Sequence, residues 1–443
     1  MSATDSSDPA LTSSPRPPAA ATRVLIIGAG FAGLAALAGF DGTGVKVTLV
    51  DRHNYTTFQP LLYQVATAGL DAGDVAFSAR QLVRHRPWAE FTTGEVVGID
   101  WSRKEALLSD GRALAFDFLI LAAGAVTNYF GVSGAEENSL AIYTLEDALE
   151  VRARLYSQLE AADSNPTDGA LTFVVVGGGA TGVEMAGALA ELLHASLERD
   201  YPHLRPSFAR VLLVERQDGL LGAFDESLGR YTVKELSRRG VEVRLGESVK
   251  EIRPGEVQLG SGEVVKACLI VWGAGVAASP LGAKIDAELT RAGRIVVADD
   301  LRFGGRPDAF AVGDIAAAPM APGGEIAPQL AQPAIQAGAH AAKQILRLIE
   351  GKETEAFHYR DKGTMATIGR HAAVAQLNWG IDLRGAPAWI AWLALHLVTL
   401  LGMRNRLAVL VNWAWRYLSW WRGPRLIVGA ETGRSAAPTR AQE

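Results

Sequence analysis

Two copies of the pattern G-x-G-x-x-G constrain the fold of this chain more than any other feature. They occupy residues 28–33 and 177–182, and each follows a run of apolar and β-branched residues typical of a buried strand. Glycines at this spacing let a strand turn sharply into a helix whose free N–H groups point at a bound anion. One copy is weak evidence, but two copies in the same context predict two sites for dinucleotides.

Each copy also has the acidic residue that such a site needs after its second strand. Asp51 ends the run 45–50, and Glu215 ends the run 211–214. A carboxylate at this position accepts hydrogen bonds from ribose hydroxyls. Chance glycine-rich turns are the alternative, but strand, glycines, helix and acid recur here in the same order. The glycines that we expect at the two pyrophosphates are Gly28, Gly30, Gly33, Gly177, Gly179 and Gly182.

The order along the chain indicates which dinucleotide binds where. Segments 118–124 and 309–314 resemble the flavin-contacting parts of two-dinucleotide reductases, and they flank the second glycine motif. The first site is therefore expected to hold FAD. Asp314 would accept a hydrogen bond from a ribityl hydroxyl, although an Asp after a strand is more often a turn or cap residue. Glu215 favours a free 2′-hydroxyl and hence NADH over NADPH, unless Arg216 offers a partner to a 2′-phosphate.

Composition excludes several other functions. A net charge of −5 over 443 residues gives no sign of nucleic-acid binding. The chain has one cysteine, Cys268, so it cannot relay electrons through a cysteine pair as disulfide reductases do. Cys268 lies in an apolar run and is expected to be a small core residue.

These patterns predict an α/β protein with two Rossmann-like domains. An FAD-binding domain (23–150 and 290–356) would be interrupted by an NADH-binding domain (151–289). A helical membrane-associating region would follow at 357–427. Residues 1–22 are rich in Ser, Pro and Ala and hold no apolar stretch of a signal peptide, so we expect a disordered tail there and a second tail at 428–443.

The C-terminal region combines tryptophan with arginine. Six of the ten Trp lie between Trp389 and Trp421, and the segment from Arg384 to Arg425 holds six Arg and no acidic residue. Its apolar run, 388–401, is shorter than the ~20 residues of a bilayer span. Trp suits the headgroup level and Arg attracts anionic lipid, so we expect an amphipathic helical anchor lying on the bilayer surface. The alternatives are apolar dimer or core helices and a spanning hairpin.

An acceptor that dissolves in lipid would suit such an anchored enzyme. The segment Ala331-Gln-Pro-Ala-Ile-Gln336 opens a helix, and Pro333 suits its first turn. Gln332 and Gln336 are four residues apart and share one helix face, so they could flank a quinone headgroup and bind its carbonyl. The alternative is that both glutamines are ordinary polar residues at the start of a helix.

Taken together, these motifs resemble those of type II NADH dehydrogenases, the NADH:quinone oxidoreductases that do not pump protons. The resemblance runs from Arg23 to Leu426, and its most specific part is the 331–336 segment with the Trp-rich tail. It implies non-covalent FAD, NADH as electron donor and menaquinone or ubiquinone as acceptor. It also implies a homodimer on the cytoplasmic face of the bacterial inner membrane. No Ca²⁺-binding insertion is evident, and no metal site is expected.

The resemblance also implies roles for single residues. Glu184 would lie near the nicotinamide and the flavin. Its alternative role is that of an acidic residue in the first turn of a helix, where its charge interacts favourably with the helix dipole. Lys362 is interpreted as a loop charge, and no proton shuttle is assigned to His340 or His396. The other residues expected at the cofactors are Phe31, Asp51, Arg52, Gln59, Pro60, Ala123, Gly124, Gly313, Asp314 and Ala331 for FAD, and Glu215, Gly273 and Gly275 for NADH.

Two other classes share both glycine motifs. A soluble NADH:ferredoxin or rubredoxin reductase should lack the apolar basic tail. A redox-sensing flavoprotein would bind both cofactors and turn over poorly with quinones. Comparing NADH oxidation with a short-chain quinone and with an iron–sulfur protein as electron acceptors therefore separates the three hypotheses.

Overall fold

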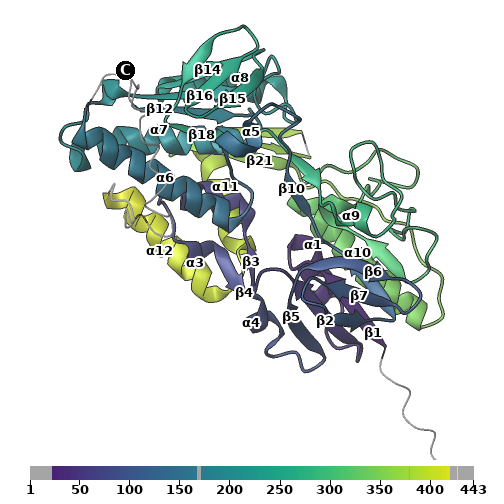
Figure 1. Cartoon of the computed structure of the whole chain (residues 1–443). Helices are drawn as coiled ribbons and strands as arrows, with labels where there is room; N and C mark the ends of the chain where they lie inside the picture. Colours follow the sequence, from purple (N-terminus) through teal and green to yellow (C-terminus); the bar gives the residue numbers. More distant parts are fainter. Residues whose placement is uncertain (1–21, 167–170, 379, 420–426, 428–443) are drawn as a thin grey trace, which may run out of the picture.

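The computed structural model describes residues 22–166, 171–378, 380–419 and 427. The two predicted tails lie outside the described residues, apart from Thr22. Two α/β domains lie at opposite ends of the molecule, and the C-terminal helices pack beside the second domain (Figure 1). The α/β prediction with two dinucleotide-binding folds is confirmed, and its details determine where the site residues lie.

The first domain is built on a five-stranded parallel sheet with the strand order β20-β9-β1-β2-β5. The strands are β1 (Arg23–Ile27), β2 (Lys46–Asp51), β5 (Ala89–Thr93), β9 (Phe118–Leu121) and β20 (Ala309–Ala311). Helices α1 (Phe31–Ala38) and α10 (Ala331–Ile349) pack against each other closely. A Cβ at Gly338 would lie 2.0 Å from the Ala32 carbonyl oxygen, so only glycine allows this approach.

The second domain repeats this plan with the order β11-β18-β12-β13-β14. Its strands are β11 (Leu140–Ala141), β12 (Leu171–Val176), β13 (Ala209–Val214), β14 (Val241–Arg244) and β18 (Leu269–Trp272). Every residue of β12 is buried, as expected of a central parallel strand covered on both faces. The long helices are α6 (Leu145–Ser164), α7 (Ala180–Asp200) and α8 (Glu226–Arg238).

The chain passes between the domains through two antiparallel strands, β10 (Ala125–Thr127) and β19 (Val276–Ala278). Leu140 already belongs to the second sheet, so the chain leaves the first domain before the predicted boundary at 150. It also returns before the predicted position 290, since the Ser279 amide donates to the Gly124 carbonyl at 3.0 Å. The predicted boundary cuts through helix α6, which packs on the second sheet.

Shorter elements complete both domains. The small sheets are β3 (Tyr55–Thr57) with β4 (Ala76–Ser78), then β6 (Val96–Asp100), β7 (Glu105–Leu108) and β8 (Ala113–Ala115), and β15 (Val249–Arg253), β16 (Glu256–Leu259) and β17 (Val264–Lys266). The short helices are η1 (Gln59–Leu61), α2 (Leu62–Ala66), α3 (Ala72–Val75), α4 (Ala79–Val83), α5 (Ala135–Asn138), η2 (Pro206–Phe208), α9 (Leu281–Lys284) and η3 (Gly313–Ile315).

The C-terminal region begins with a sheet that is absent from the sequence-based prediction. Strands β21 (Thr364–Gly369), β22 (Ala372–Leu377) and β23 (Ile381–Gly385) form an antiparallel sheet, where the sequence predicts only helices. Helices α11 (Ala386–Thr399) and α12 (Met403–Ser419) follow. Strand β21 packs on α7 so closely that a Cβ at Gly187 would lie 2.0 Å from the Ile368 carbonyl oxygen.

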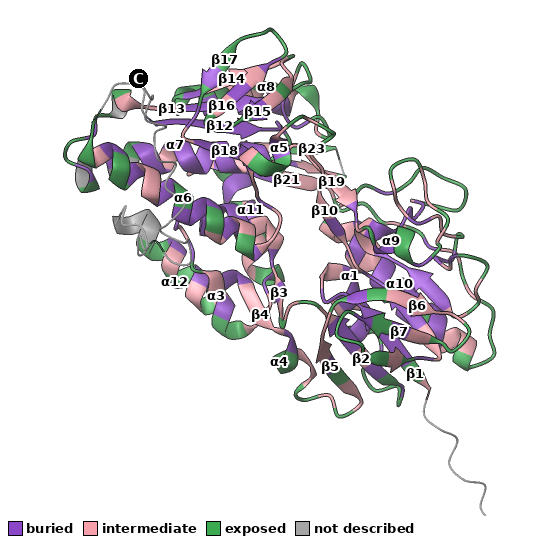
Figure 2. Ribbon diagram, in the orientation of Figure 1, coloured by how far each residue is buried: buried purple, intermediate pink, exposed green. Residues whose placement is uncertain are grey.

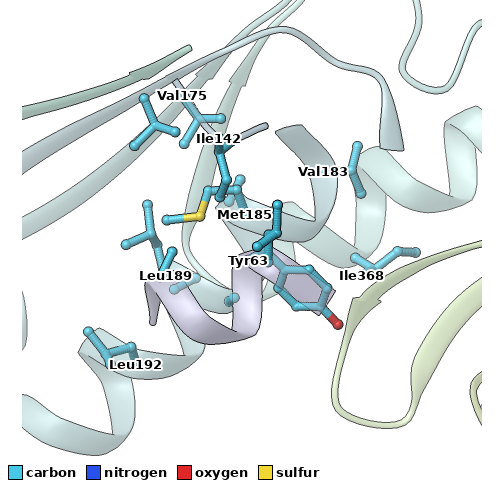
Figure 3. Close-up of a cluster of buried hydrophobic side chains, with 14 of the residues drawn as sticks. Tyr63, Ile142, Val175, Val183, Met185, Leu189, Leu192 and Ile368 are labelled. Carbon is cyan, nitrogen blue, oxygen red and sulfur yellow. The ribbon is translucent and has the colours of Figure 1, made fainter. Parts of the chain in front are cut away.

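One large core joins the second domain to this C-terminal region. Side chains from α2, α7, β12 and β21 meet in it, including Tyr63, Met185 and Ile368 (Figure 3). Figure 2 shows that buried residues concentrate in the strands and on the helix faces turned toward them. Trp389, Trp392 and Trp413 are also buried in this core. For these three tryptophans, the expected place at the lipid headgroups is therefore wrong.

Candidate functional site

The first glycine motif forms a narrow turn between β1 and α1. Gly28 has φ +105°, and a Cβ there would lie 2.3 Å from the Ala122 carbonyl oxygen. A Cβ at Gly33 would lie 1.8 Å from the Gly28 carbonyl oxygen. A Cβ at Gly30 would meet no atom within 4 Å, so this glycine leaves open space at the N-terminus of α1. The turn therefore fits a pyrophosphate at the helix N-terminus.

A cavity of about 250 Å³ opens over this turn. The predicted FAD residues that line it are Gly28, Gly30, Asp51, Arg52, Gln59, Ala123 and Gly124. Asp51 is held by two backbone amides, Ala29 N–H at 2.7 Å and His53 N–H at 2.8 Å. These bonds fix the carboxylate at the end of β2, beside the glycine turn, as a ribose-binding residue requires.

Gly313 and Asp314 lie at the start of η3, directly after β20. Gly313 has φ +74°, a conformation that favours glycine. Burial raises the pKa of Asp314 to about 6, and the positive charge of Arg294 opposes this rise only in part. Among the described residues no donor binds the Asp314 carboxylate; only its backbone oxygen accepts a bond, from Gln329 Nε2 at 3.0 Å. A half-buried carboxylate without a donor fits a ribityl hydroxyl of FAD.

The second glycine motif repeats the first. Gly177 has φ +107°, and a Cβ there would lie 2.5 Å from the Ala274 Cα atom. A Cβ at Gly182 would lie 1.8 Å from the Gly177 carbonyl oxygen, whereas Gly179 has open space around it. Glu215 accepts hydrogen bonds from the Gly178 amide and, at 2.7 Å, from the Gln217 amide. This geometry fits a second dinucleotide.

Gly273 and Gly275 form the turn after β18, next to the second glycine motif. A Cβ at Gly273 would lie 3.4 Å from the Gly182 backbone nitrogen. Gly275 has φ +153°, and its Cβ would lie 3.0 Å from the Phe130 ring. Gly273 therefore lets this turn pack closely against the second glycine motif, and a side chain at Gly275 would crowd the Phe130 ring.

A larger cavity, of about 860 Å³, lies between α1, α10, the C-terminal sheet and α11. The predicted residues Phe31, Pro60, Ala331 and Gln332 line it. The Gln332 Oε1 atom is buried and has no hydrogen-bond partner among the described residues. A buried amide oxygen without a donor is unfavourable, and a ligand that supplies a hydrogen bond would relieve this cost.

Gln336 is engaged elsewhere. Its Oε1 accepts from the Arg360 amide at 2.9 Å, and its Nε2 donates to the Arg360 carbonyl at 2.9 Å. Gln336 is also not among the residues that line the large cavity. The structure therefore does not bring the two glutamines together at this cavity, although helical spacing puts them on one face. Gln336 positions the segment that leads into β21.

Glu184 lies on the first turns of α7 and faces β21. Its Oε1 accepts from the Thr367 amide at 3.2 Å, and burial raises the pKa of Glu184 to about 8. It lines a small cavity of about 20 Å³ with Tyr63 and Trp392, separate from the 860 Å³ cavity. This side chain is half-buried between a dinucleotide domain and the C-terminal region, so it is more than a solvated first-turn acid.

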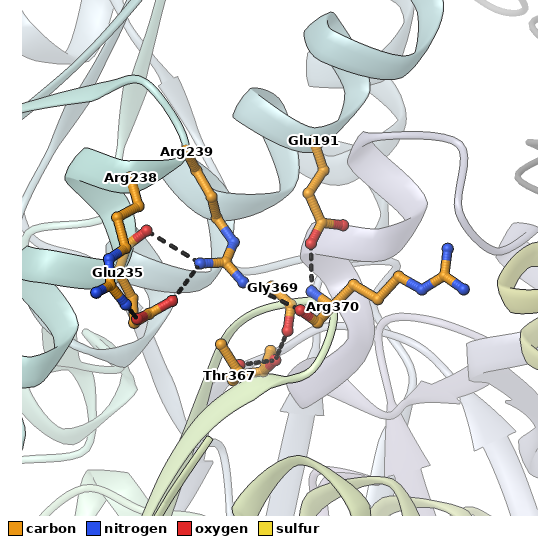
Figure 4. Close-up of polar contacts among 8 residues, drawn as sticks. Glu191, Glu235, Arg238, Arg239, Thr367, Gly369 and Arg370 are labelled. Atoms are coloured by element: carbon orange, nitrogen blue, oxygen red, sulfur yellow. Dashed lines mark hydrogen bonds and ion pairs between the residues drawn. The ribbon is translucent and has the colours of Figure 1, made fainter. Parts of the chain in front are cut away.

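The turn between β21 and β22 is fixed from two sides (Figure 4). Glu191 on α7 accepts from the Arg370 amide, and Arg239, the residue after α8, donates to the Arg370 carbonyl at 3.0 Å. Arg239 is itself paired with Glu235 at 2.8 Å. These contacts hold β21 against α7 and so place the Thr367 amide at Glu184.

His396 is a cavity residue that sequence reasoning missed. It lies on α11 and lines the large cavity, where its ring stacks on Trp392 with centroids 3.9 Å apart. A single His in an apolar run gives no sequence signal of this kind, because neither its neighbours nor its spacing forms a motif. Only the packing of α11 brings the ring to the cavity.

Helices α11 and α12 present an exposed apolar surface next to this cavity. Its residues are Ile390, Leu395, Val398, Met403, Leu407, Leu410, Val411 and Trp415. Arg404 lies on the same surface and is exposed. Leu395 and Thr399 belong to α11 and also line the cavity. Within the described residues, each helix is too short or too polar to cross a bilayer.

Two family models match the chain. The model for pyridine nucleotide-disulphide oxidoreductases matches residues 22–338, and the model for the NDH2 C-terminal domain matches residues 362–419. The second match covers β21–β23, α11 and α12, which are the elements that sequence reasoning described least well. Together the models cover both α/β domains and the C-terminal region.

Known proteins match over almost the whole length. The type II NADH:quinone oxidoreductase NdhA of Mycobacterium tuberculosis is 40% identical over 91% of this chain and 89% of its own. That of Haemophilus influenzae is 31% identical over 84% of this chain and 92% of its own. The structure of NDH2 from Plasmodium falciparum in complex with NADH has the same fold, with TM-score 0.84, 20% identity and coverage of 91% and 99%. The chain belongs to the type II NADH:quinone oxidoreductases.

Proposed function

We propose that this protein holds FAD non-covalently, oxidises NADH and delivers two electrons to a lipid quinone without pumping protons. One observation carries the proposal. The cavity of about 860 Å³ begins at the FAD-side residues Phe31 and Pro60 and extends to α11, beside the exposed apolar surface. It offers a lipid-soluble acceptor a path from the membrane to the flavin.

The first domain would hold the cofactor through backbone amides and two carboxylates. The N–H groups at the start of α1 would bind the pyrophosphate, Asp51 the ribose and Asp314 a ribityl hydroxyl. When bound, the flavin accepts hydride from a nicotinamide and passes electrons to a quinone. The contribution of the chain is to position both reactants and to keep water from the reacting atoms.

The second domain would bind NADH in the same manner. Gly177, Gly179 and Gly182 leave room for the pyrophosphate, and Glu215 would accept from the ribose hydroxyls. The carboxylate would repel a 2′-phosphate, so NADH is the preferred donor. The turn at Gly273 and Gly275 would then direct the nicotinamide toward the first domain.

Gln332 is the residue that we assign to the quinone headgroup. Its amide can donate to a quinone carbonyl and accept from a quinol hydroxyl, which would satisfy the buried Oε1 atom. Ala331 precedes it at the first position of α10, and the N-terminus of this helix would favour negative charge on a flavin bound beside it. Glu184 would stay protonated near neutral pH, because burial raises its pKa to about 8. It would be a neutral acid close to both cofactors.

The exposed surface of α11 and α12 would rest on the bilayer. It combines large apolar side chains with Arg404, a pattern that suits an interface rather than a span. We place the protein on the cytoplasmic face of the bacterial inner membrane, where NADH is available. A homodimer is compatible with this placement and is part of the same proposal.

The first experiment measures NADH oxidation by FAD-loaded protein with a short-chain quinone, comparing the native chain with Gln332→Ala and Gln336→Ala. The proposal predicts quinone-dependent turnover and a larger rise in quinone KM for Gln332→Ala. Flavin reduction by NADH without quinone turnover would reject the proposal in favour of an iron–sulfur acceptor or a sensor.

A second experiment tests the membrane surface by flotation with anionic phospholipid vesicles. The double variant Val398→Ser, Val411→Ser removes two apolar side chains that are 66% and 63% exposed. Val264→Ser removes an exposed valine of β17, which belongs to a separate small sheet, and is the matched control. Only the double variant should lose vesicle binding. Equal binding by all three proteins would contradict the anchor.

A further inference from the structure

His396 places a polar ring at the α11 end of the large cavity, among apolar side chains. Its ring stacks on Trp392 with an interplanar angle of 24°, and it meets Phe58 edge-on with centroids 6.0 Å apart. Trp392 is only 1% exposed, so the indole cannot move aside. The orientation of the imidazole is therefore fixed by packing on two sides.

The hydrogen bond of His396 sets its tautomer. The Nδ1 atom lies 2.7 Å from the Trp392 carbonyl oxygen. A carbonyl only accepts, so Nδ1 carries the hydrogen and Nε2 carries the lone pair. Among the described residues Nε2 has no hydrogen-bond partner, and it is not among the fully buried polar atoms. The cavity is where a partner for Nε2 can lie.

The ring stays neutral in this position. Burial lowers the pKa of His396 to about 4, and the bond to Trp392 opposes this only in part. Near neutral pH the imidazole therefore accepts a hydrogen bond at Nε2 and has no proton to give there.

The two forms of a quinone differ in what they offer to such a group. Both oxygens of the oxidised ring are acceptors, whereas both oxygens of the reduced ring are hydroxyls that donate. A hydrogen-bond acceptor that is fixed in an apolar cavity wall therefore distinguishes the two forms, because only the reduced ring can donate a hydrogen bond to it. Gln332 has no such preference, since its amide offers both donor and acceptor.

We propose that His396 is a product-binding residue, whose Nε2 atom accepts a hydrogen bond from one hydroxyl of the quinol. The inference rests on the proposed function, because it takes the large cavity as the quinone site. In this arrangement His396 sets the residence time of the quinol in the cavity, while Gln332 binds both the quinone and the quinol.

Anaerobic calorimetry on the FAD-loaded enzyme tests this directly, with ubiquinone and ubiquinol of one isoprene unit as ligands. His396→Phe keeps a ring against Trp392 and removes the acceptor, whereas His396→Gln restores an amide oxygen. Thr399→Val is the control, because Thr399 lines the same cavity but its hydroxyl donates to the Leu395 carbonyl at 2.8 Å.

We expect His396→Phe to raise the Kd of the quinol about 5- to 10-fold, the size of one lost hydrogen bond, and that of the quinone less than about 2-fold. His396→Gln should recover part of the loss, and Thr399→Val should change both ligands alike. Equal effects of His396→Phe on quinone and quinol, or none on either, would overturn the inference. Steady-state turnover of the native enzyme is measured in parallel, so absence of quinone reduction would reject the proposed function separately.

Discussion

Replacing Glu184 by glutamine should change how the stability of this protein depends on pH. Burial raises the pKa of Glu184 from 4.5 to about 8. Below about pH 4.5 the carboxyl is protonated in both the folded and the unfolded chain. As the pH rises toward 8, the unfolded chain releases the proton and the folded chain keeps it, so the free energy of unfolding falls. Above about pH 8 the whole penalty is present.

The penalty follows from the size of the pKa change. At ~1.4 kcal/mol for each pKa unit, the difference between 4.5 and about 8 corresponds to about 5 kcal/mol. A glutamine side chain would keep the shape of the protonated acid and would not ionise. Part of this penalty is already present at pH 5, so Glu184→Gln should gain about 4 kcal/mol in unfolding free energy, relative to the native protein, between pH 5 and pH 9.

Urea unfolding of the FAD-loaded proteins, followed at several pH values from 5 to 9, measures this difference. Glu226→Gln, at an exposed position of α8, controls for the loss of one carboxylate. A difference between Glu184→Gln and the native protein that stays constant over this range, or that falls as the pH rises, would refute the link between burial and stability at this carboxyl.

Four further substitutions have distinct outcomes. Gly33→Ala should prevent folding, because its Cβ would lie 1.8 Å from a backbone oxygen. Gly30→Ala should fold, because a Cβ there meets no protein atom, but it should bind FAD more weakly. The expression level and the flavin content of the purified proteins separate the two outcomes. Gln336→Leu should lower the unfolding free energy by about 1–2 kcal/mol through two lost bonds to Arg360, a loss that urea titration measures. Glu215→Gln should raise the KM for NADH more than that for NADPH in steady-state assays, and an unchanged ratio would contradict its ribose role.

The parts of the site that sequence reasoning found are those that depend on local geometry. Strand, glycine turn, helix and acid occupy a short stretch of chain, so their spacing alone determines how Gly28 and Asp51 lie together. The same holds for the second motif. The positions of Gln332 and Gln336 were predicted only in part, because helical spacing says which residues share a face and not what that face meets.

The C-terminal region was harder to predict because its structure depends on distant contacts. Strands β21–β23 are short, and the turn after β21 is held by Glu191 and Arg239 from other parts of the chain. Residue type alone places the tryptophans at the lipid headgroups. In the structure Trp392 and Trp413 are buried in the core, and aliphatic side chains such as Val398 and Leu407 are exposed instead. The apolar pattern fitted either arrangement, and tertiary packing decided between them.

The paired strands β10 and β19 give the second domain the character of a removable module. Both connections of the second domain pass through one short antiparallel ladder. The second domain could therefore be exchanged for one that prefers another nucleotide, while the sheet of the first domain stays intact. Such a graft would have to match the core that the second domain shares with the C-terminal region, and one requirement is strict. The incoming helix must carry a glycine where Gly187 now lies, because any side chain there would strike the Ile368 carbonyl and lift the C-terminal sheet from its place.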